Sequence, residues 1–426
     1  MKFVTKLRGA LVNKHQIVIA GAGYGGVVAA HYLTKNMLPE DRYEVVLINP
    51  EPWQDSRSEL DLIIDHRTNS DFTRIPLTNI FREKEVRLIY GRMTEIDKDN
   101  KEIEVELTKG GERFKLPYSE LVIATGAEAS YPPVPGLKEH ALTFWTTDDA
   151  EEFRAKLEER FSEASQTDQD SVREELLTIT VVGAGASGVE AVGPLVESVK
   201  SLASQMNINP DEITINLVDG IDHVLMDLPD NMRKQADEYL KSLGVNLYLG
   251  SFVDRVEEDE LTLKSGQKIP YGLLMFAGGA KPSEQTNSWG FERDRFNRII
   301  TTADLLVDGE VNIWSLGDVA AVKGEGVDSY PMLAQHAMRQ GSLVAKNILK
   351  KLSGDPKLED YDGKSHGQFV SIGNNFALGW ALKDSIQLDG KLGSLMKHMI
   401  YAMYWNEAGG PRLVLDRLKK LRRIRK

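Results

Sequence analysis

The sequence contains no cysteine among its 426 residues. Disulfide bonds, zinc or iron–sulfur sites held by thiolates, and redox relays between cysteine pairs are therefore excluded. The chain also has no stretch approaching the roughly 20 apolar residues that a membrane-spanning helix needs. Its beginning, MKFVTKLRGALVNKHQIVIAGAG, has no long apolar region followed by a small-residue cleavage site. These absences predict a cytoplasmic protein that works without cysteine chemistry.

Charge is distributed unevenly along the chain. The net charge of −12 argues against broad binding to nucleic acid. The last fifteen residues, RLVLDRLKKLRRIRK, instead carry eight Lys or Arg and one acid. The overall composition, with 41% hydrophobic and 27% charged residues, is typical of a soluble globular protein. A chain of this length favours two or three domains.

A glycine-rich turn near the N-terminus is the first informative motif. The segment HQIVIAGAGYGGVVAAHYL combines a short apolar run, this turn and a helical pattern. Glycines let the backbone approach a pyrophosphate, and the helix N-terminus offers free N–H groups and a positive dipole. The turn consists of Gly21, Ala22, Gly23, Tyr24, Gly25 and Gly26. The next apolar strand ends in Asn49 and Pro50, where many dinucleotide sites place a carboxylate.

The same pattern recurs later in the chain. TITVVGAGASGVEAVGPL again combines a strand, a turn with Gly183, Gly185 and Gly188, and a helix, starting 162 positions after the first copy (183 minus 21). Two such units arise by chance far less often than one. The following strand, EITINLVDG, ends in Asp219. An acid at this position accepts hydrogen bonds from ribose hydroxyls and repels a 2′-phosphate, which favours NADH over NADPH.

Two further segments carry a family resemblance. YSELVIATGAEASYPPVPG contains a strand that leads into Ala124, Thr125 and Gly126, and EVNIWSLGDVAAV delivers Gly317 and Asp318. Placed around an inserted glycine unit, they resemble the flavoprotein reductases with two dinucleotide-binding domains. The resemblance implies that the first unit holds FAD, with Asp318 at the ribityl–phosphate region, and that the second holds NADH. The disulfide reductases and sulfide:quinone oxidoreductases of this superfamily use cysteines, so both chemistries are excluded.

The last third of the chain resembles the type II NADH dehydrogenases, the single-subunit NADH:quinone oxidoreductases. PMLAQHAMRQGSLVAKNI is similar to the family's Ala-Gln-x-Ala-x-Gln helix start, and ASGVEAVGPL and VSIGNNFALGW also fit the family. The resemblance implies catalytic roles for Glu190, Gln335 and Arg339. It implies cofactor contacts for Met93, Gly278, Gly279, Ala334, Gln335 and Lys397.

Arg339 is the main departure from that family, because it occupies the position of the second quinone-site Gln. An arginine side chain cannot accept a hydrogen bond. It can donate one to a quinone carbonyl or stabilise reduced, anionic flavin, or it can close the site to an apolar head group. These alternatives stay open in the sequence.

Each candidate residue also has a purely structural interpretation. Glu190 follows Gly188 by two positions, and in the first turn of a helix an acid complements the helix dipole. Gln335 is equally consistent with a polar residue that begins a helix. His336 is expected to be a surface or packed histidine. Lys397 aligns with a flavin-contacting lysine of the family, and a solvated helix lysine is the alternative.

The C-terminal segment has the pattern of an interfacial helix. Apolar residues recur at helical spacing between Lys and Arg in the last sixteen positions, 411–426. Such a helix lies in the membrane interface and is attracted to anionic lipids. A packed helix with a solvated basic face, or a homodimer contact, is the alternative.

The sequence therefore predicts an α/β protein with two Rossmann-like dinucleotide-binding domains and a C-terminal amphipathic membrane-binding region. We expect a split FAD domain (1–145 and 292–370) around an NADH domain (146–291), followed by the membrane-binding region (371–426). The expected activity is transfer of electrons from NADH through FAD to a membrane quinone of a respiratory chain, without proton pumping, at the cytoplasmic face of the cell membrane. An NADH-dependent reductase of a soluble electron carrier and a cofactor-binding redox sensor are the alternatives.

Overall fold

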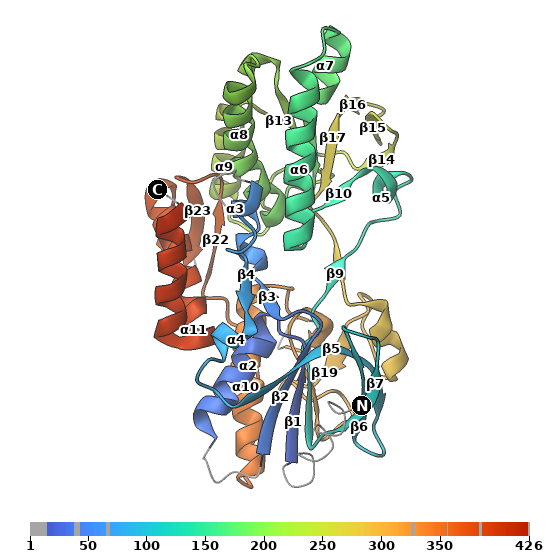
Figure 1. The fold of residues 1–426 in the computed structure, drawn as a ribbon, viewed down its shortest axis with the longest axis vertical. Helices are drawn as coiled ribbons and strands as arrows, with labels where there is room; N and C mark the ends of the chain where they lie inside the picture. The colour runs from blue at the N-terminus through green and yellow to red at the C-terminus, as the bar shows by residue number, and fades with distance from the viewer. Residues whose placement is uncertain are drawn as a thin grey trace.

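The fold consists of two α/β units joined along one side by a C-terminal region (Figure 1). The computed structural model describes residues 15–37, 43–64, 69–324, 329–355, 357–382 and 386–424. Within these ranges no helix is long and apolar enough to cross a membrane. The first unit lies at the bottom of Figure 1 and the second at the top.

The first unit is built on a seven-stranded sheet. In spatial order its strands are β20 (Ile313–Ser315), β8 (Glu120–Ile123), β1 (His15–Ala20), β2 (Tyr43–Asn49), β5 (Val86–Asp97), β6 (Glu102–Leu107) and β7 (Arg113–Pro117). The strands from β20 to β5 are parallel, and β6 and β7 continue as an antiparallel meander. The central strands are continuous apolar runs, because a parallel sheet is covered on both faces.

Two helices that are far apart in the sequence pack together on this sheet. They are α2 (Tyr24–Asn36), which follows the first glycine turn, and α10 (Ala334–Leu352), which begins the segment with Gln335. Shorter elements complete the unit: β3 (Trp53–Asp55), η1 (Arg57–Glu59), β4 (Arg74–Pro76), α4 (Leu77–Ile80), η3 (Glu284–Trp289), β19 (Ile299–Thr301), η4 (Gly317–Val319) and β21 (Ala320–Val322). The short helix α3 (Asp61–Ile64), which follows η1, instead packs against helices of the second unit.

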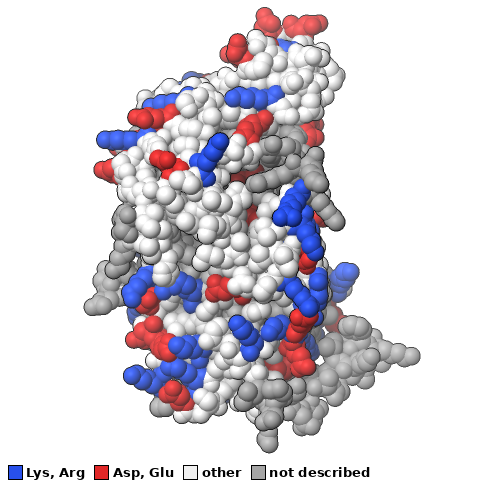
Figure 2. All heavy atoms as spheres, turned by 90° about the vertical axis from the view of Figure 1, so that its left-hand side faces the viewer, with Lys and Arg blue, Asp and Glu red and all other residues white. Residues whose placement is uncertain are grey.

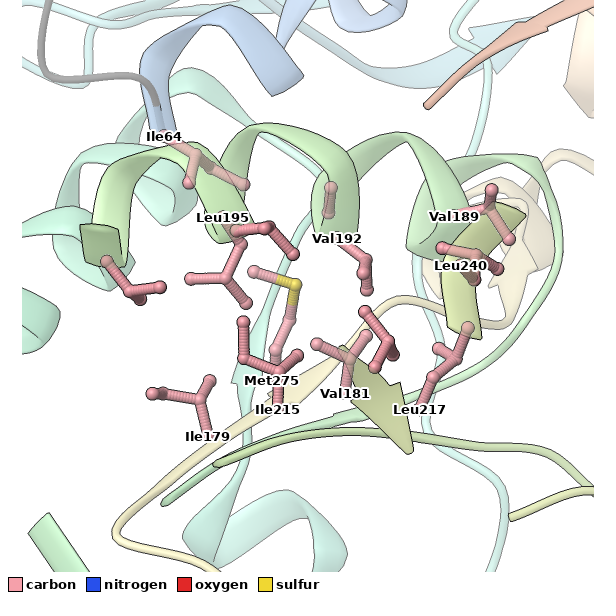
Figure 3. Close-up of a cluster of buried hydrophobic side chains, with 14 of the residues drawn as sticks. Ile64, Ile179, Val181, Val189, Val192, Leu195, Ile215, Leu217, Leu240 and Met275 are labelled. Carbon is pink, nitrogen blue, oxygen red and sulfur yellow. The ribbon is translucent and has the colours of Figure 1, made fainter. Parts of the chain in front are cut away.

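The second unit repeats the design around a five-stranded parallel sheet. Its strands are β10 (Leu142–Thr143), β17 (Leu273–Phe276), β11 (Thr178–Val182), β12 (Thr214–Val218) and β13 (Val245–Tyr248). Its helices are α6 (Thr147–Ala164), α7 (Asp170–Leu176), α8 (Ala186–Met206) and α9 (Asp230–Ser242). Figure 3 shows the apolar side chains of α8 facing those of β11 and β12 in the core.

Smaller elements complete the second unit and connect it to the first. An antiparallel sheet of β14 (Val253–Val256), β15 (Glu260–Leu263) and β16 (Lys268–Pro270) lies beside α5 (Leu137–His140), and η2 (Pro210–Glu212) precedes β12. The two chain crossings between the units pair as β9 (Glu128–Ala129) and β18 (Ala280–Lys281). The second glycine unit is therefore inserted into the first, and the two connections between the units run side by side as a two-stranded antiparallel ribbon.

The C-terminal region contacts both units. It contains a three-stranded sheet of β22 (Gly367–Ser371), β23 (Ala377–Ala381) and β24 (Ile386–Leu388), then α11 (Gly390–Ile424). β22 packs against α8 of the second unit, where a Cβ at Gly193 would come within 2.0 Å of the Gly373 nitrogen. α11 packs against α2 and α4 of the first unit. The region therefore bridges the two dinucleotide-binding units.

α11 is two helices joined by a kink at Gly410, which has a φ of 73° and is followed by Pro411. The second half is less exposed than its amphipathic pattern suggests, because Leu413 is buried in the core of the first unit. Arg417 is also buried, and its guanidinium lies 2.7 Å from the Glu59 carboxylate with side-chain exposures of 3% and 1%. One face of the basic helix is therefore part of the first unit, and binding of the helix to a membrane stays a prediction.

Candidate functional site

The two glycine turns have nearly identical geometry. Gly21 and Gly183 have φ values of 107° and 110°, which suit glycine, and each donates its N–H to the end of the neighbouring strand at 2.8 Å. A Cβ at Gly26 would lie 1.9 Å from the Gly21 oxygen, and one at Gly188 would lie 1.9 Å from the Gly183 oxygen. Both turns therefore require glycine for close contact between helix and strand.

The starts of α2 and α8 are both open to a ligand. Their N-caps, Gly23 and Gly185, form no side-chain capping bond, and neither helix has an acid in its first turn. A Cβ added at either glycine would meet nothing within 4 Å. Free N–H groups and the positive end of the helix dipole then face open space, an arrangement suited to a phosphate. Both sites therefore fit the diphosphate of a dinucleotide.

The residues after the second strand of each unit correspond to one another. The Asn49 side-chain oxygen accepts a hydrogen bond from the Ala22 N–H at 3.0 Å, and the Asp219 carboxylate accepts one from the Ala184 N–H at 2.6 Å. Asp219 also accepts from the Ile221 N–H at 3.1 Å. Each carboxylate oxygen has a second lone pair, so Asp219 retains acceptors for a ribose. Its role in selecting NADH stays a prediction.

The opposite wall of the first site comes from the predicted Ala124–Gly126 and Gly317–Asp318 segments. A Cβ at Gly21 would lie 2.3 Å from the Ala124 oxygen, so these two backbones are in contact. Thr125 is exposed beside this contact. In the second unit Ala277, followed by Gly278 and Gly279, occupies the equivalent place opposite Gly183. The side chain of Met93 is buried in the core behind the sheet, so its cofactor contact stays a prediction.

Asp318 lies next to the start of α10. The Gly317 N–H donates to the Gln340 side chain at 2.7 Å, which ties this turn to the helix. Burial raises the pKa of Asp318, while Arg57 and Arg298 act to lower it. Asp318, Pro331 and His336 line a small surface hollow. Gln340, the residue after Arg339, therefore holds the Gly317 turn in place.

Glu190 and Lys397 form a shielded ion pair between the second unit and the C-terminal region. Their charged atoms are 2.6 Å apart, and the side chains are only 13% and 12% exposed. Glu190 also accepts hydrogen bonds from the Ser371 N–H and hydroxyl, and Lys397 donates to the Phe369 oxygen at 3.1 Å. Glu190 is the fifth residue of α8, and the helix has no acid in its first turn. Both structural interpretations, a dipole-complementing acid and a solvated lysine, are therefore wrong.

Asp61 joins this ion pair as a second buried carboxyl. Burial raises the pKa of Asp61 to about 8, and the charge of Glu190 adds to the rise while Lys397 opposes it. Burial would lower the pKa of Lys397, but Glu190 and Asp61 raise it above its ordinary value. Tyr401 lies beside Lys397, with 5.4 Å between the ammonium and the ring centre, and its hydroxyl donates to the Ser58 oxygen. One ammonium thus faces two carboxyl groups.

Gln335 begins α10 as predicted, but its side chain contacts the C-terminal region. Its amide nitrogen donates to the Ser365 hydroxyl at 3.3 Å and to the Gly367 oxygen at 3.2 Å. One turn later, the Arg339 guanidinium donates to the Lys364 oxygen and forms an ion pair with Asp362. The two side chains therefore hold the same segment, residues 362–367, against α10.

The charge of Arg339 is compensated by Asp362. Although burial acts to raise the pKa of Asp362, the Lys364 N–H and the Arg339 guanidinium lower it below its ordinary value. Arg339 also lies over the Tyr361 ring, 5.4 Å from its centre. His336 is buried as expected, and its ring bonds the Tyr361 hydroxyl at 2.6 Å.

Sequence reasoning missed Asp61, Asp362 and Ser371. Asp61 and Asp362 lie in stretches without a recognisable motif, and Ser371 lies in the family-like segment VSIGNNFALGW but was not singled out. Asp362 and Ser371 each bind a partner more than twenty positions away, because Asp362 pairs with Arg339 and Ser371 donates to Glu190. The one sequence signal for Asp362 is the unusual Arg339, a cation that needs an acidic partner.

Comparison with known proteins agrees with this geometry. The sequence model of the pyridine nucleotide-disulphide oxidoreductases matches residues 15–341, which contain both glycine turns and the Gly317 segment. The chain belongs to this family. Because it has no cysteine, it is a member without the disulphide chemistry in the family name.

Relatives within and around the family cover nearly the whole chain. A type II NADH:quinone oxidoreductase of Staphylococcus aureus is 26% identical over 392 residues, 91% of this chain and 94% of that protein. The structure of NDH2 from Plasmodium falciparum in complex with NADH has a TM-score of 0.83 at 17% identity, covering 96% and 98% of the two chains. The sulfide:quinone oxidoreductase from Aquifex aeolicus has a TM-score of 0.74 at 17% identity, covering 93% and 92%. These structures show the two-unit fold.

Proposed function

We propose that this protein is an FAD-dependent NADH:quinone oxidoreductase of the type II class. The observation that carries the proposal is the shielded pair of Glu190 and Lys397, which joins the NADH unit to the C-terminal region. Gln335 reaches the same C-terminal strand, β22, from the first unit. Side chains from both dinucleotide-binding units and the C-terminal region thus converge around one strand. The name of the Staphylococcus aureus relative supports the same activity.

The two open helix starts divide the cofactors between the units. We assign FAD to the first turn, with Asn49 holding the turn and Asp318 facing the ribityl chain. NADH is assigned to the second turn, where Asp219 accepts hydrogen bonds from the adenosine ribose and disfavours a 2′-phosphate. With FAD bound, the reaction moves a hydride from NADH to the flavin and two electrons onward to the quinone.

Reduction of a quinone to a quinol consumes protons as well as electrons, so the site needs a proton carrier. Glu190 Oε1 and Lys397 Nζ form a charged pair between the second unit and the C-terminal region, and beside them burial raises the pKa of the Asp61 carboxyl to about 8. The proposed role of Glu190 is to pass a proton to the acceptor side, with Lys397 holding its carboxylate in place. No step involves proton pumping.

Arg339 is proposed as a positioning residue of the acceptor site. Its guanidinium is committed to Asp362 and to the Lys364 oxygen, so it holds the 362–367 segment over Gln335. Because Asp362 carries the opposite charge, the ion pair cancels the positive charge that Arg339 would bring to the acceptor site. An apolar quinone head group is therefore compatible with arginine at the position of the family's second Gln.

The C-terminal region offers a surface for membrane docking. Exposed apolar side chains cluster on β24, the turn before it and the first half of α11, and we call them the apolar face: Leu382, Ile386, Leu392, Leu395, Met399, Ile400 and Met403. In α11 four of them recur at spacings of three and four, so they share one side of the helix. Figure 2 views this side of the molecule, where uncharged surface lies between two groups of charged side chains.

We propose that the apolar face enters the lipid interface while basic residues of the second half of α11 contact anionic head groups. Arg412, Lys419 and Arg422 are exposed there, which fits attraction to an anionic surface. The acceptor side would then open toward the lipid-soluble quinone at the cytoplasmic face of the membrane, as a peripheral enzyme. A homodimer through the same face is the competing assembly.

Flotation with phosphatidylglycerol vesicles tests the docking proposal. Met403 is 67% exposed on the apolar face, and Val311 is 70% exposed far from it in the sequence and on the first unit. Met403→Glu should leave the protein in the aqueous phase, because a carboxylate resists transfer from water. Val311→Glu is the matched control and should float like the unmodified protein. Loss of dimers without loss of flotation in Met403→Glu would favour the dimer interface instead.

Acceptor assays test the activity itself. NADH oxidation should proceed with a short-chain quinone in the presence of vesicles and stay slow with a ferredoxin-like carrier. Turnover with the carrier alone would support the soluble-carrier reductase. Flavin bleaching by NADH without rapid reoxidation by either acceptor would support the redox sensor.

A further inference from the structure

Arg57 is a cation at the first dinucleotide site that the sequence motifs do not include. It begins η1, directly after β3. Burial lowers the pKa of Arg57, yet its surface is exposed to solvent. Arg57 is therefore accessible to a ligand from solvent.

The guanidinium of Arg57 is held in place before any ligand binds. It lies over the Trp145 ring at 4.5 Å from the ring centre and donates to the Ala127 oxygen at 3.2 Å. The Trp145 indole N–H donates to the same oxygen at 3.2 Å. Arginine has five N–H donors in a rigid plane, so one bond to protein leaves a fork of donors for an anion.

Arg57 is also tied to the start of α2. The next residue, Ser58, donates its N–H to the Tyr24 hydroxyl at 3.0 Å, and the two hydroxyls are 2.7 Å apart. Tyr24 is the first residue of α2, directly after the uncapped Gly23. The cation is therefore fixed close to the helix start that suits a diphosphate.

Within the described part of the chain, no carboxylate neutralises Arg57 by direct contact. Asp318 is the acid that acts on it most strongly, but among the described residues none forms an ion pair with Arg57. Arg74, on the neighbouring strand β4, stacks on Trp53 in a similar way and pairs with Asp148. Unlike Arg74, Arg57 therefore keeps a positive charge with no carboxylate at ion-pair distance in the parts of the chain that the structure describes.

We propose that Arg57 binds the diphosphate of FAD, opposite the N–H groups at the start of α2. A diphosphate carries two negative charges, and the helix end supplies only about half a positive charge. A fixed guanidinium adds a full charge and two-pronged hydrogen bonds to phosphate oxygens. The assignment rests on the flavin-dependent function proposed above, and its test needs no acceptor.

FAD binding by Arg57→Gln, Arg57→Lys and the control Arg74→Gln tests this role. Release of FAD from the purified holoprotein on dilution, followed by flavin fluorescence, gives the dissociation constant. Arg57→Gln should raise that constant about 10- to 100-fold, because a charge-assisted hydrogen bond is lost. Arg57→Lys should lie between, since an ammonium lacks the planar fork. Arg74→Gln should bind FAD as the unmodified protein does.

Two results would overturn the assignment. One is an Arg57→Gln or Arg57→Lys protein that keeps FAD as tightly as the Arg74→Gln control. The other is unchanged FAD affinity with a lowered flavin midpoint potential, which would place Arg57 at the flavin ring. Purification of the unmodified protein without any flavin would instead contradict the proposed function, so the two failures are distinguishable. If Arg57→Gln does not fold, the FAD dissociation constant of Arg57→Lys, compared with that of Arg74→Gln, tests the assignment by itself.

Discussion

Replacing Arg417 with methionine tests whether the second half of α11 is part of the folded first unit. The Arg417 guanidinium lies 2.7 Å from Glu59 and 3.8 Å from the centre of the Phe72 ring, with Trp405 on another side. Methionine keeps much of the apolar stem but removes the charge. Glu59 then remains as a buried carboxylate bonded only to the Ser56 hydroxyl among these partners.

The expected cost follows from the burial of both partners. Breaking a buried ion pair by removing one side costs about 3–5 kcal/mol, because the other charge is left without compensation. For a folding unit of roughly 150–250 residues, each kcal/mol lowers the melting temperature by about 2–4 °C. Arg417→Met should therefore lower the temperature of FAD release by about 6–20 °C. Adding Glu59→Gln should recover a large part of this loss.

Arg412→Met on the same helix is the matched control. Arg412 pairs with Glu83, but the two side chains are 68% and 62% exposed, so this ion pair should contribute less than about 1 kcal/mol. Thermal unfolding followed by flavin fluorescence compares the three variants. A loss for Arg417→Met no larger than for Arg412→Met would show that the basic helix is detachable, and the packing argument would be refuted.

Further predictions concern the buried pair and the acceptor site. Glu190→Gln should slow quinol formation by about 100-fold, as expected for loss of a proton carrier, while NADH affinity measured by titration changes little. Asp61 has a folded pKa of about 8 against an unfolded value of 3.8, so the folded state holds an extra proton between these values and stability falls as pH rises through them. In Asp61→Asn this part of the decline should disappear, which amounts to at most about 1.4 kcal/mol per pH unit in denaturant titrations; an unchanged slope would contradict the assigned burial. Arg339→Gln should release the 362–367 segment and raise the KM for quinone about tenfold without changing the rate of flavin reduction by NADH, and an equal effect in Asp362→Asn would identify the ion pair as the cause.

The parts of the fold that the sequence predicted are those fixed by neighbouring residues. The strand, turn and helix around Gly21 and Gly183 follow from local apolar runs and from contacts that only glycine permits. The start of α10 at Ala334 was also visible, because a proline precedes a regular helical pattern. Such signals lie within about twenty positions and need no knowledge of tertiary contacts.

The parts that the sequence did not predict depend on partners far along the chain. Lys397 and Glu190 are 207 positions apart, and neither motif indicates that they meet. Arg417 has the spacing of a solvated basic residue, yet it is buried against Glu59. A helix that lies on a membrane and a helix that packs against protein have the same amphipathic spacing, so the pattern does not show which of the two covers the apolar side. Tertiary packing therefore determines the burial and the partners of Lys397 and Arg417.

The most direct test of the proposed function is a single-turnover experiment on the purified holoprotein. NADH is added in the absence of oxygen until the flavin absorbance is bleached, and the reduced protein is then mixed with a menaquinone analogue in vesicles. We expect return of the oxidised flavin spectrum at a rate at least equal to steady-state turnover, with a marked slowing in Glu190→Gln. A flavin that stays bleached with the quinone, but is reoxidised by a soluble carrier protein, would contradict the proposed function.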